Sequence, residues 1–217
     1  SRPFLVLSLA LNYSFGGLNV FGYHVANFAI HVTAGIALFA LVFRTLRLDP
    51  ETGQSISRAR WLALSISLIW LIHPLQTESV TYIIQRGESM MGMFFILFIY
   101  CYLRGSQAAR AWPWYVTAVA IFWLGVGTKE VMVMALPVAL LYDRVFLSKT
   151  PAEIFRQRWP MYAACGIAVV WFALFLLPVH SHSDNPAAGF GMREVTPLGY
   201  LATQQGVVLH YLRLALW

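Results

Sequence analysis

The chain has 217 residues, of which 59% are hydrophobic and 11% are charged, and its mean hydropathy is +0.65. Both fractions exclude an ordinary soluble domain. The apolar residues form long continuous runs, which predict an all-α, polytopic transmembrane helix bundle, because helices satisfy their own backbone groups in lipid. The formal charge of +6 does not indicate nucleic-acid binding, because the basic residues lie in links between apolar runs.

Six apolar runs are predicted to form membrane helices. They cover residues 22–43, 61–72, 88–103, 112–128, 131–147 and 160–179. A membrane crossing takes about 20 residues, so the second run is short. We expect a kink or break at Pro74, because proline lacks a backbone donor. Residues 197–217 form either an interfacial amphipathic helix, which we favour for the first half, or a seventh span. The prediction is one transmembrane domain, residues 1–217, with six to seven spans.

The distribution of charge predicts the topology. Ten of the fifteen Lys and Arg residues lie in the links 44–60, 104–111 and 144–158. The positive-inside rule places these three links in the cytoplasm. The links 73–87, 129–130 and 180–196 carry only Arg86, Lys129 and Arg193 as basic residues, so we expect them on the extracytoplasmic side.

Ionisable side chains in the outer links are candidates for a functional site. They are His73, Glu78, Arg86, Glu88 and Lys129. An ionisable group at membrane depth is costly and therefore points to function. Arg86 and Lys129 suit a lipid phosphate, Arg by paired hydrogen bonds and Lys as a point charge. Glu78 or Glu88 could act as a catalytic base or orient a metal or a sugar hydroxyl, and His73 could shuttle a proton.

Simpler roles stay open for several of these residues. Glu88 could pair with Arg86 or Lys129, and Lys129 with Glu130 could be an ordinary interfacial charge pair. His24, Asn27 and His31 share one helix face. We treat these three and Glu130 as supporting residues. For the three residues on the shared helix face we favour a role in helix packing through hydrogen bonds.

Ordered motifs through the chain carry a resemblance to a known family. They are Arg2-Pro3, Leu11-Asn12-Tyr13, Gly22-Tyr23-His24-Val25-Ala26-Asn27 with His31, His73-Pro74-Leu75-Gln76-Thr77-Glu78-Ser79-Val80, Arg86-Gly87-Glu88, Thr128-Lys129-Glu130 with Pro137 and Tyr142-Asp143, and the closing run Gln205-Gly206-Val207-Val208-Leu209-His210-Tyr211-Leu212-Arg213-Leu214-Ala215-Leu216-Trp217. Together they resemble the transmembrane-and-tetratricopeptide-repeat (TMTC-like) O-mannosyltransferases and their bacterial relatives. The His-Pro-x-x-Thr-Glu pattern is specific, and the other motifs follow in the expected order.

The resemblance implies a GT-C glycosyltransferase fold. Such an enzyme moves a sugar from a polyprenyl-phosphate carrier in the membrane lipid to an acceptor, a protein hydroxyl or a glycan, on the extracytoplasmic side. The family's acidic pair, its presumed catalytic base, is expected upstream of Arg2, and its tetratricopeptide repeats downstream. We therefore expect a partial GT-C domain, and Glu78 and Glu88 are not assigned as the base merely to fill that place. The sequence does not decide whether a divalent metal takes part, and it assigns no metal ligand.

Two other functions compete with the transferase. One is a non-enzymatic structural subunit of a membrane complex, in which the polar residues seal a helix bundle. The other, less favoured, is a transporter whose charged residues line an ion path. Transporters often contain inverted repeats, and the chain has no convincing internal symmetry. The sequence leaves the sugar, the acceptor, the membrane and the oligomeric state open.

Overall fold

The structure is a computed structural model that describes residues 2–48, 55–147, 150–175 and 197–216. Arg2–Phe172 form one compact unit, and the residues after Phe172 belong to a second unit. The expected loop at 180–196, with its pair His180 and His182, lies outside the described residues.

All regular elements in the described residues are helices. The α-helices are α1 (Pro3–Gly16), α2 (Val20–Thr45), α3 (Ile56–Ile72), α4 (Thr77–Thr81), α5 (Arg86–Gln107), α6 (Trp112–Val126), α7 (Ala135–Phe146), α8 (Pro151–Phe175) and α10 (Pro197–Leu216). The short 3-10 helices are η2 (Pro74–Gln76), η3 (Ile83–Gln85) and η4 (Glu130–Met134). The predicted all-α class is confirmed for this part of the chain.

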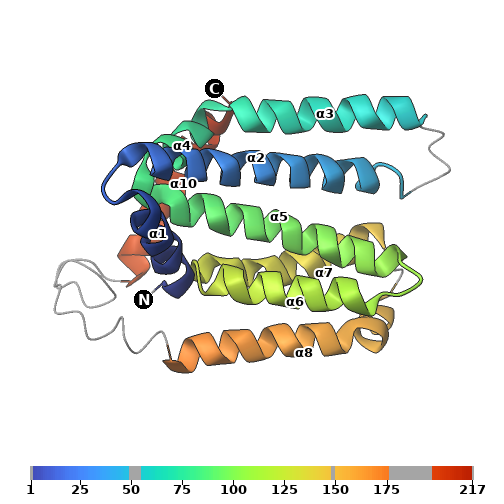
Figure 1. The fold of residues 1–217 in the computed structure, drawn as a ribbon. Helices are drawn as coiled ribbons and strands as arrows, with labels where there is room; N and C mark the ends of the chain where they lie inside the picture. Colours follow the sequence, from blue (N-terminus) through green and yellow to red (C-terminus); the bar gives the residue numbers. More distant parts are fainter. Residues whose placement is uncertain (1, 49–54, 148–149, 176–196, 217) are drawn as a thin grey trace. The chain divides into compact units, whose positions relative to one another are not determined.

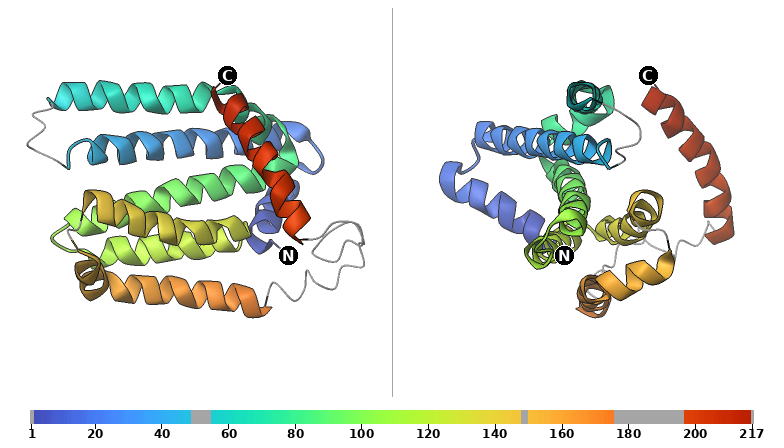
Figure 2. Two further views of the ribbon diagram at one scale, coloured as in Figure 1. Left: turned by 180° about the vertical axis from the view of Figure 1, so that it is seen from behind. Right: turned by 90° about the vertical axis from the view of Figure 1, so that its right-hand side faces the viewer.

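Long helices of the first unit run side by side in alternating directions (Figures 1 and 2). Helix α5 packs against α2 on one side and α6 on the other, and α3 packs against α2. The helix ends that flank the links 44–60, 104–111 and 144–158 all lie at one end of this unit, which we call the basic end. The helix starts of α2 and α5 and the last residues of α6 lie at the opposite end, together with α1 and α4.

Only part of the expected number of membrane spans is supported. Two helices in the described residues are long and apolar enough to cross a membrane, Val20–Thr45 and Ile83–Gln107. Three shorter apolar helices are Pro3–Gly16, Trp112–Val126 and Arg158–Leu174. A helix rises about 1.5 Å per residue, so these fall short of a hydrocarbon core about 30 Å thick. Six to seven spans are therefore not confirmed.

The break expected at Pro74 is present. Helix α3 ends at Ile72, and His73 has an extended backbone with φ −63° and ψ 133°. Its Nδ1 accepts a hydrogen bond from the Leu75 backbone N–H at 3.2 Å, which caps the short helix η2. Helix α1 was not expected, because its 14 residues are too few for a membrane span and its apolar residues show no clear stripe.

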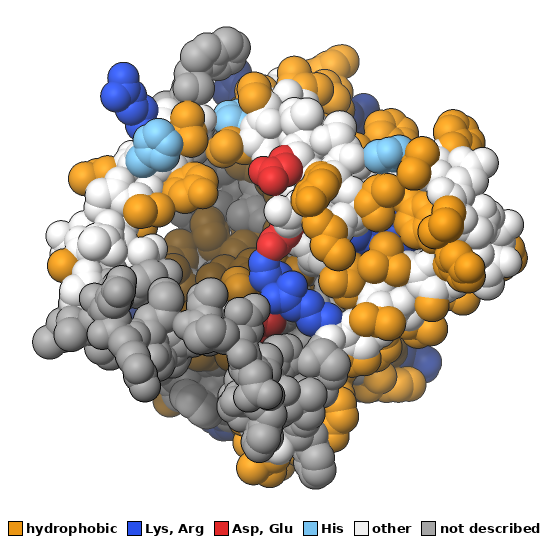
Figure 3. Space-filling view, turned by 90° about the vertical axis from the view of Figure 1, so that its left-hand side faces the viewer, with side chains coloured by type: hydrophobic (Ala, Val, Ile, Leu, Met, Phe, Trp, Pro, Cys, Tyr) orange, Lys and Arg blue, Asp and Glu red, His pale blue; other side chains and the backbone are white. Residues whose placement is uncertain are grey.

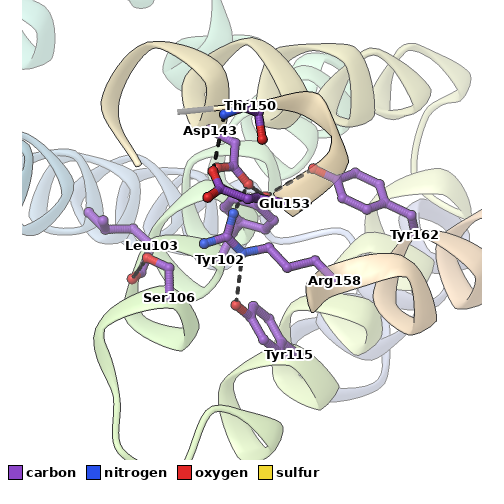
Figure 4. Close-up of polar contacts among 9 residues, drawn as sticks. All are labelled: Tyr102, Leu103, Ser106, Tyr115, Asp143, Thr150, Glu153, Arg158 and Tyr162. Atoms are coloured by element: carbon purple, nitrogen blue, oxygen red, sulfur yellow. Dashed lines mark hydrogen bonds and ion pairs between the residues drawn. The ribbon is translucent and has the colours of Figure 1, made fainter. Parts of the chain in front are cut away.

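The buried ion pair between Asp143 of α7 and Arg158 of α8 holds four helices together near the basic end (Figure 4). Tyr102 of α5 donates to Asp143 Oδ2, and Tyr162 of α8 donates to the Tyr102 hydroxyl at 3.1 Å. Arg158 Nε donates to the hydroxyl of Tyr115, on α6, at 3.2 Å. These contacts join α5, α6, α7 and α8 where their apolar faces alone would not fix the register.

We expect Asp143→Ala to destabilise the fold by about 3–5 kcal/mol, because it leaves the buried Arg158 guanidinium without its carboxylate. The thermal unfolding midpoint in detergent measures the effect. Arg144→Gln, at an exposed neighbouring position, is the matched control and should leave the midpoint nearly unchanged. An Asp143→Ala protein as stable as the control would show that the pair does not hold these helices.

Candidate functional site

The chain turns sharply where α6 ends, and this turn exposes Lys129. The buried Thr128 bonds back to the Leu124 carbonyl at 2.8 Å, and Lys129 then takes an extended conformation with φ −156° and ψ 137°. The start of α1 lies against the same turn, because the Phe4 backbone N–H donates to the Gly127 carbonyl at 3.2 Å. The N-terminal helix therefore meets a turn near the middle of the sequence here.

Four charged side chains adjoin at this turn, and we call them the charge cluster. They are Arg2, Glu88, Lys129 and Glu130. Lys129 pairs with Glu88 in the first turn of α5, and their side chains are 16% and 39% exposed. Arg2 pairs with Glu130 at 3.2 Å, with exposures of 43% and 48%. Acidic and basic side chains adjoin on the face seen in Figure 3. The cluster is thus partly open to solvent and contains two cations.

Burial and the neighbouring charges shift the pKa values of Lys129 and Glu130. Burial, and then the positive charge of Arg2, lower the pKa of Lys129, while the Glu130 carboxylate opposes that shift. Burial alone would raise the pKa of Glu130. A backbone hydrogen bond, Arg2 and Lys129 together outweigh burial, so the pKa of Glu130 is lowered. The positive charge of Arg2 therefore acts on Lys129, although each of the two cations is also paired with a carboxylate.

Arg86 begins α5 but points into the protein, where its side chain is 1% exposed. Its Nε donates to Asn27 Oδ1 at 2.7 Å, and its Nη2 donates to the Tyr23 carbonyl at 3.0 Å. Its Nη1 donates to the Asn12 Oδ1 at 2.5 Å and to the Ser8 carbonyl at 3.1 Å. Four bonds to neutral acceptors on α1 and α2 thus occupy a guanidinium that has five N–H groups.

The two predicted phosphate ligands are therefore held differently. Lys129 lies in the partly exposed charge cluster and pairs with Glu88, which is one of the two partners expected for Glu88. Arg86 lies two residues before Glu88, and side chains two apart on a helix point to different faces. No ion pair joins Arg86 to a carboxylate in the described residues. The geometry favours Arg86 as a packing residue over Arg86 as a direct phosphate ligand.

The other two candidate catalytic residues lie away from the ion pairs of the cluster. Glu78 is exposed in the first turn of α4, and no side-chain contact of its carboxylate occurs in the described part of the chain. His73 is half-buried and caps η2 through its ring. Helix α4 is attached to α5 by a hydrogen bond of 2.7 Å from the Ser89 hydroxyl to the Ser79 carbonyl.

The three supporting residues of α2 divide in their roles. Asn27 is fully buried and, besides accepting from Arg86, its Nδ2 donates to the Val80 carbonyl at 3.4 Å. The ring of His31 contacts the Leu71 carbonyl at 2.9 Å and stacks on Trp70. These contacts support helix packing for both residues. His24 is exposed and has no hydrogen bond among the residues described.

A metal site is not evident in the described ranges, which contain no group of three or more His, Cys, Asp or Glu placed to hold an ion. Two residues of the site were missed by sequence reasoning. Arg2 and Asn12 were noted only for the resemblance, yet Arg2 joins the charge cluster and Asn12 holds Arg86. The unexpected helix α1 brings both to the site, and its short apolar run gave no signal of that position.

Comparisons with known proteins agree with the resemblance. The chain is 26% identical over 207 residues to protein O-mannosyl-transferase TMTC2 of Homo sapiens, covering 86% of this chain and 23% of that protein. It is 29% identical over 232 residues to protein O-mannosyl-transferase Tmtc1 of Drosophila melanogaster, covering 96% of this chain and 26% of that protein. The resemblance to TMTC O-mannosyltransferases is thereby confirmed.

The similarity concerns a part of these relatives, since the chain spans about a quarter of their length. A third relative, protein O-mannosyl-transferase TMTC3 of Homo sapiens, is 25% identical over 86% of this chain and 22% of its own length. No family model and no solved structure matches the chain.

We expect Arg2→Gln to raise the pKa of Lys129, because it removes the nearby positive charge. Glu88→Gln should lower it, because it removes the paired carboxylate. The chain has two lysines, Lys129 and Lys149, so ¹³C-dimethylation followed by an NMR pH titration can observe each one. Lys149→Arg assigns the signals. A Lys129 titration that neither variant moves would show that the four charges do not form one cluster.

Proposed function

We propose that this chain belongs to a membrane glycosyltransferase that moves a sugar from a polyprenyl-phosphate carrier to a protein hydroxyl. The observation that carries the proposal is the charge cluster, which places two cations, Arg2 and Lys129, together at the end opposite the basic links. The relatives' printed names supply the sugar and the acceptor class to test first, mannose and protein.

Transfer breaks the bond between the sugar and the carrier phosphate, so negative charge develops on the departing phosphate oxygen. Cations already in place stabilise that charge without rearranging. Lys129 and Arg2 are held by carboxylates, and both remain partly exposed. A phosphate that enters the cluster can take over one cation from each ion pair. The exposed apolar side chains of α1 and the start of α2, including Phe15 and Phe21, suit a lipid tail at the same end.

The acceptor hydroxyl must lose a proton as its oxygen attacks the sugar. A carboxylate in an ion pair is a weaker base than a free one, because the cation stabilises its charged form. Glu88 and Glu130 are paired, whereas Glu78 is exposed without such a partner in the described residues. Of the predicted catalytic residues, Glu78 is therefore the better candidate for the base, and this role requires the acceptor hydroxyl to lie at α4, away from the ion pairs of the cluster. His73, immediately before η2, has its Nδ1 engaged by the Leu75 N–H, so a proton relay would use its Nε2.

We propose that the membrane topology follows the charge distribution. The basic end then faces the cytoplasm, and the charge cluster faces the extracytoplasmic side. The shorter helices α3, α6 and α7 and the apolar part of α8, Arg158–Leu174, would cross with α2 and α5, with flanking Trp and Arg side chains at the two interfaces to compensate for their length. Arg104, in the last turn of α5, lies over the ring of Trp114, in the first turn of α6, and these two side chains are anchors of this kind at the basic end.

A structural membrane subunit is the second candidate. It is favoured by the state of Arg86, whose buried hydrogen bonds serve packing, and by the balanced charge of the cluster, in which each cation has a carboxylate. This candidate requires no affinity for a phosphate at the cluster. Binding of the carrier lipid therefore separates the two functions.

We expect Lys129→Ala to weaken binding of a polyprenyl phosphate by roughly 10- to 150-fold, which corresponds to one lost charged hydrogen bond worth about 1.5–3 kcal/mol. The dissociation constant is measured with a short-chain polyprenyl phosphate in nanodiscs. Arg60→Gln, an exposed cation flanking the first basic link, is the control. Unchanged binding in Lys129→Ala, with the control also unchanged, would favour the structural subunit.

The sidedness has a separate test. A cysteine at Ser57, in the first basic link, should resist a membrane-impermeant thiol reagent added to intact cells, and one at Thr77, on α4, should react. Both positions are exposed, while the native Cys101 and Cys165 are buried. Labelling of Ser57→Cys instead of Thr77→Cys would invert the topology and exclude extracytoplasmic transfer.

A further inference from the structure

Helix α1 is attached to the bundle by the same guanidinium that begins α5. Of the four hydrogen bonds that Arg86 donates, two go to α1, at the Ser8 carbonyl and Asn12 Oδ1. The other two go to α2. If α1 moved away, a buried cation would keep only half of its acceptors. An unsatisfied buried charge is strongly unfavourable, so the charge of Arg86 favours the docked position of α1.

Apart from Arg86, α1 contacts the bundle near its start and through two hydrogen bonds to α2 near its end. Asn12 Nδ2 donates to the Gly22 carbonyl at 3.2 Å, and the Tyr23 hydroxyl donates to the Gly17 carbonyl, just after α1, at 3.0 Å. The Phe4 backbone bonds to Gly127, and the buried Leu5 packs against Gly87. Farther along, Val6, Leu7 and Leu11 are exposed. Helix α1 therefore has a small apolar contact area, and the polar contacts to Arg86 carry much of the specificity of its position.

The position of α1 decides where Arg2 lies. Arg2 is the residue immediately before α1, and its guanidinium reaches Glu130. Lys129, across the cluster, pairs with Glu88 of α5, and no hydrogen bond or ion pair joins its side chain to α1 in the described residues. Release of α1 would remove Arg2 from the cluster but leave Lys129 paired with Glu88.

We propose that Arg86 is a positioning residue, which docks α1 and thereby places Arg2 in the charge cluster as a second cation for the carrier phosphate. This role rests on the proposed function for the cluster, but the docking itself does not. It differs from direct phosphate binding, because every acceptor found for Arg86 belongs to α1 or α2 and its side chain is 1% exposed.

A disulfide between positions 4 and 127 reports on the docking of α1. A side chain added at Gly127 would meet the Phe4 ring, and Gly127 has an ordinary helical conformation with φ −74° and ψ −8°. Phe4→Cys with Gly127→Cys should therefore cross-link under mild oxidation in membranes that contain the protein. Each single-cysteine variant is the control for cross-links to the native buried cysteines.

We expect Arg86→Lys to lower the rate of this cross-linking by about tenfold or more, because lysine keeps the charge but loses the arrangement of donors to α1. Asn12→Ala should act in the same direction, because it removes an acceptor of Arg86 and also the bond from Asn12 Nδ2 to the Gly22 carbonyl of α2. Ser14→Ala is the matched control on α1, since its hydroxyl bonds only within the helix, to Leu11. Cross-linking that neither Arg86→Lys nor Asn12→Ala slows would overturn the proposal.

Carrier binding tests the second step, from docking to the cluster. Arg2→Gln and Arg86→Lys should each weaken binding of the polyprenyl phosphate. The double variant should bind no less tightly than the single variant with the lower affinity, because both substitutions remove the same cation from the cluster. Asn12→Ala should weaken binding as well. The opposite result would be that the losses of affinity in Arg2→Gln and Arg86→Lys multiply in the double variant while Asn12→Ala binds normally. That result would identify Arg86 as a direct ligand and overturn its positioning role.

The two proposals fail in different ways. If the cluster does not bind phosphate, Arg2→Gln leaves carrier binding unchanged, yet Arg86→Lys still slows cross-linking. If Arg86 does not position α1, Arg2→Gln weakens binding while cross-linking in Arg86→Lys stays normal. The cross-link thus tests docking without requiring the transferase activity.

Discussion

A buried guanidinium whose acceptors are all neutral is the constraint on which this end of the structure depends. Burying Arg86 is tolerable only when its N–H groups are satisfied, and this requires α1 and α2 to meet at the first turn of α5. With α1 in this position, its first turn reaches the end of α6 and Arg2 reaches Glu130. Under the positioning role proposed for Arg86, the place of Arg2 in the charge cluster therefore follows from satisfying Arg86, whereas the pair of Lys129 with Glu88 does not depend on α1.

The two ends of the first unit use ion pairs for different purposes. At the basic end Asp143 and Arg158 are almost completely buried and surrounded by tyrosine hydroxyls, so a ligand could not reach them without separating helices. In the charge cluster the pairs are partly exposed, and their charges can exchange partners. Burial thus distinguishes a pair that holds helices from the pairs that we propose receive an anion, although both kinds look alike in the sequence.

Most helices of the first unit could be predicted from the sequence, because continuous apolar runs and their flanking prolines and basic residues are local signals. The break at Pro74 is one example, since the missing backbone donor acts at its own position. Helix α1 could not be predicted in the same way. Its run is too short for a span, and its attachment depends on Arg86, more than seventy positions later. The number of spans was predicted from hydropathy, while most of the helices are shorter than a simple crossing needs.

The candidate site shows the same division between local and distant information. The sequence left Glu88 to pair with either Arg86 or Lys129, and the structure joins it to Lys129. The motifs could not show that the side chains of Arg86 and Glu88 point in different directions. Two residues that are two positions apart lie on opposite faces only if the chain is helical there, as it is in the first turn of α5. Nor could the motifs show where Arg2 lies, since its partner is 128 positions away. A motif therefore identifies which residue types the candidate site contains. Packing decides which of the two cations, Lys129 or Arg86, lies in the charge cluster and which one holds the surrounding helices.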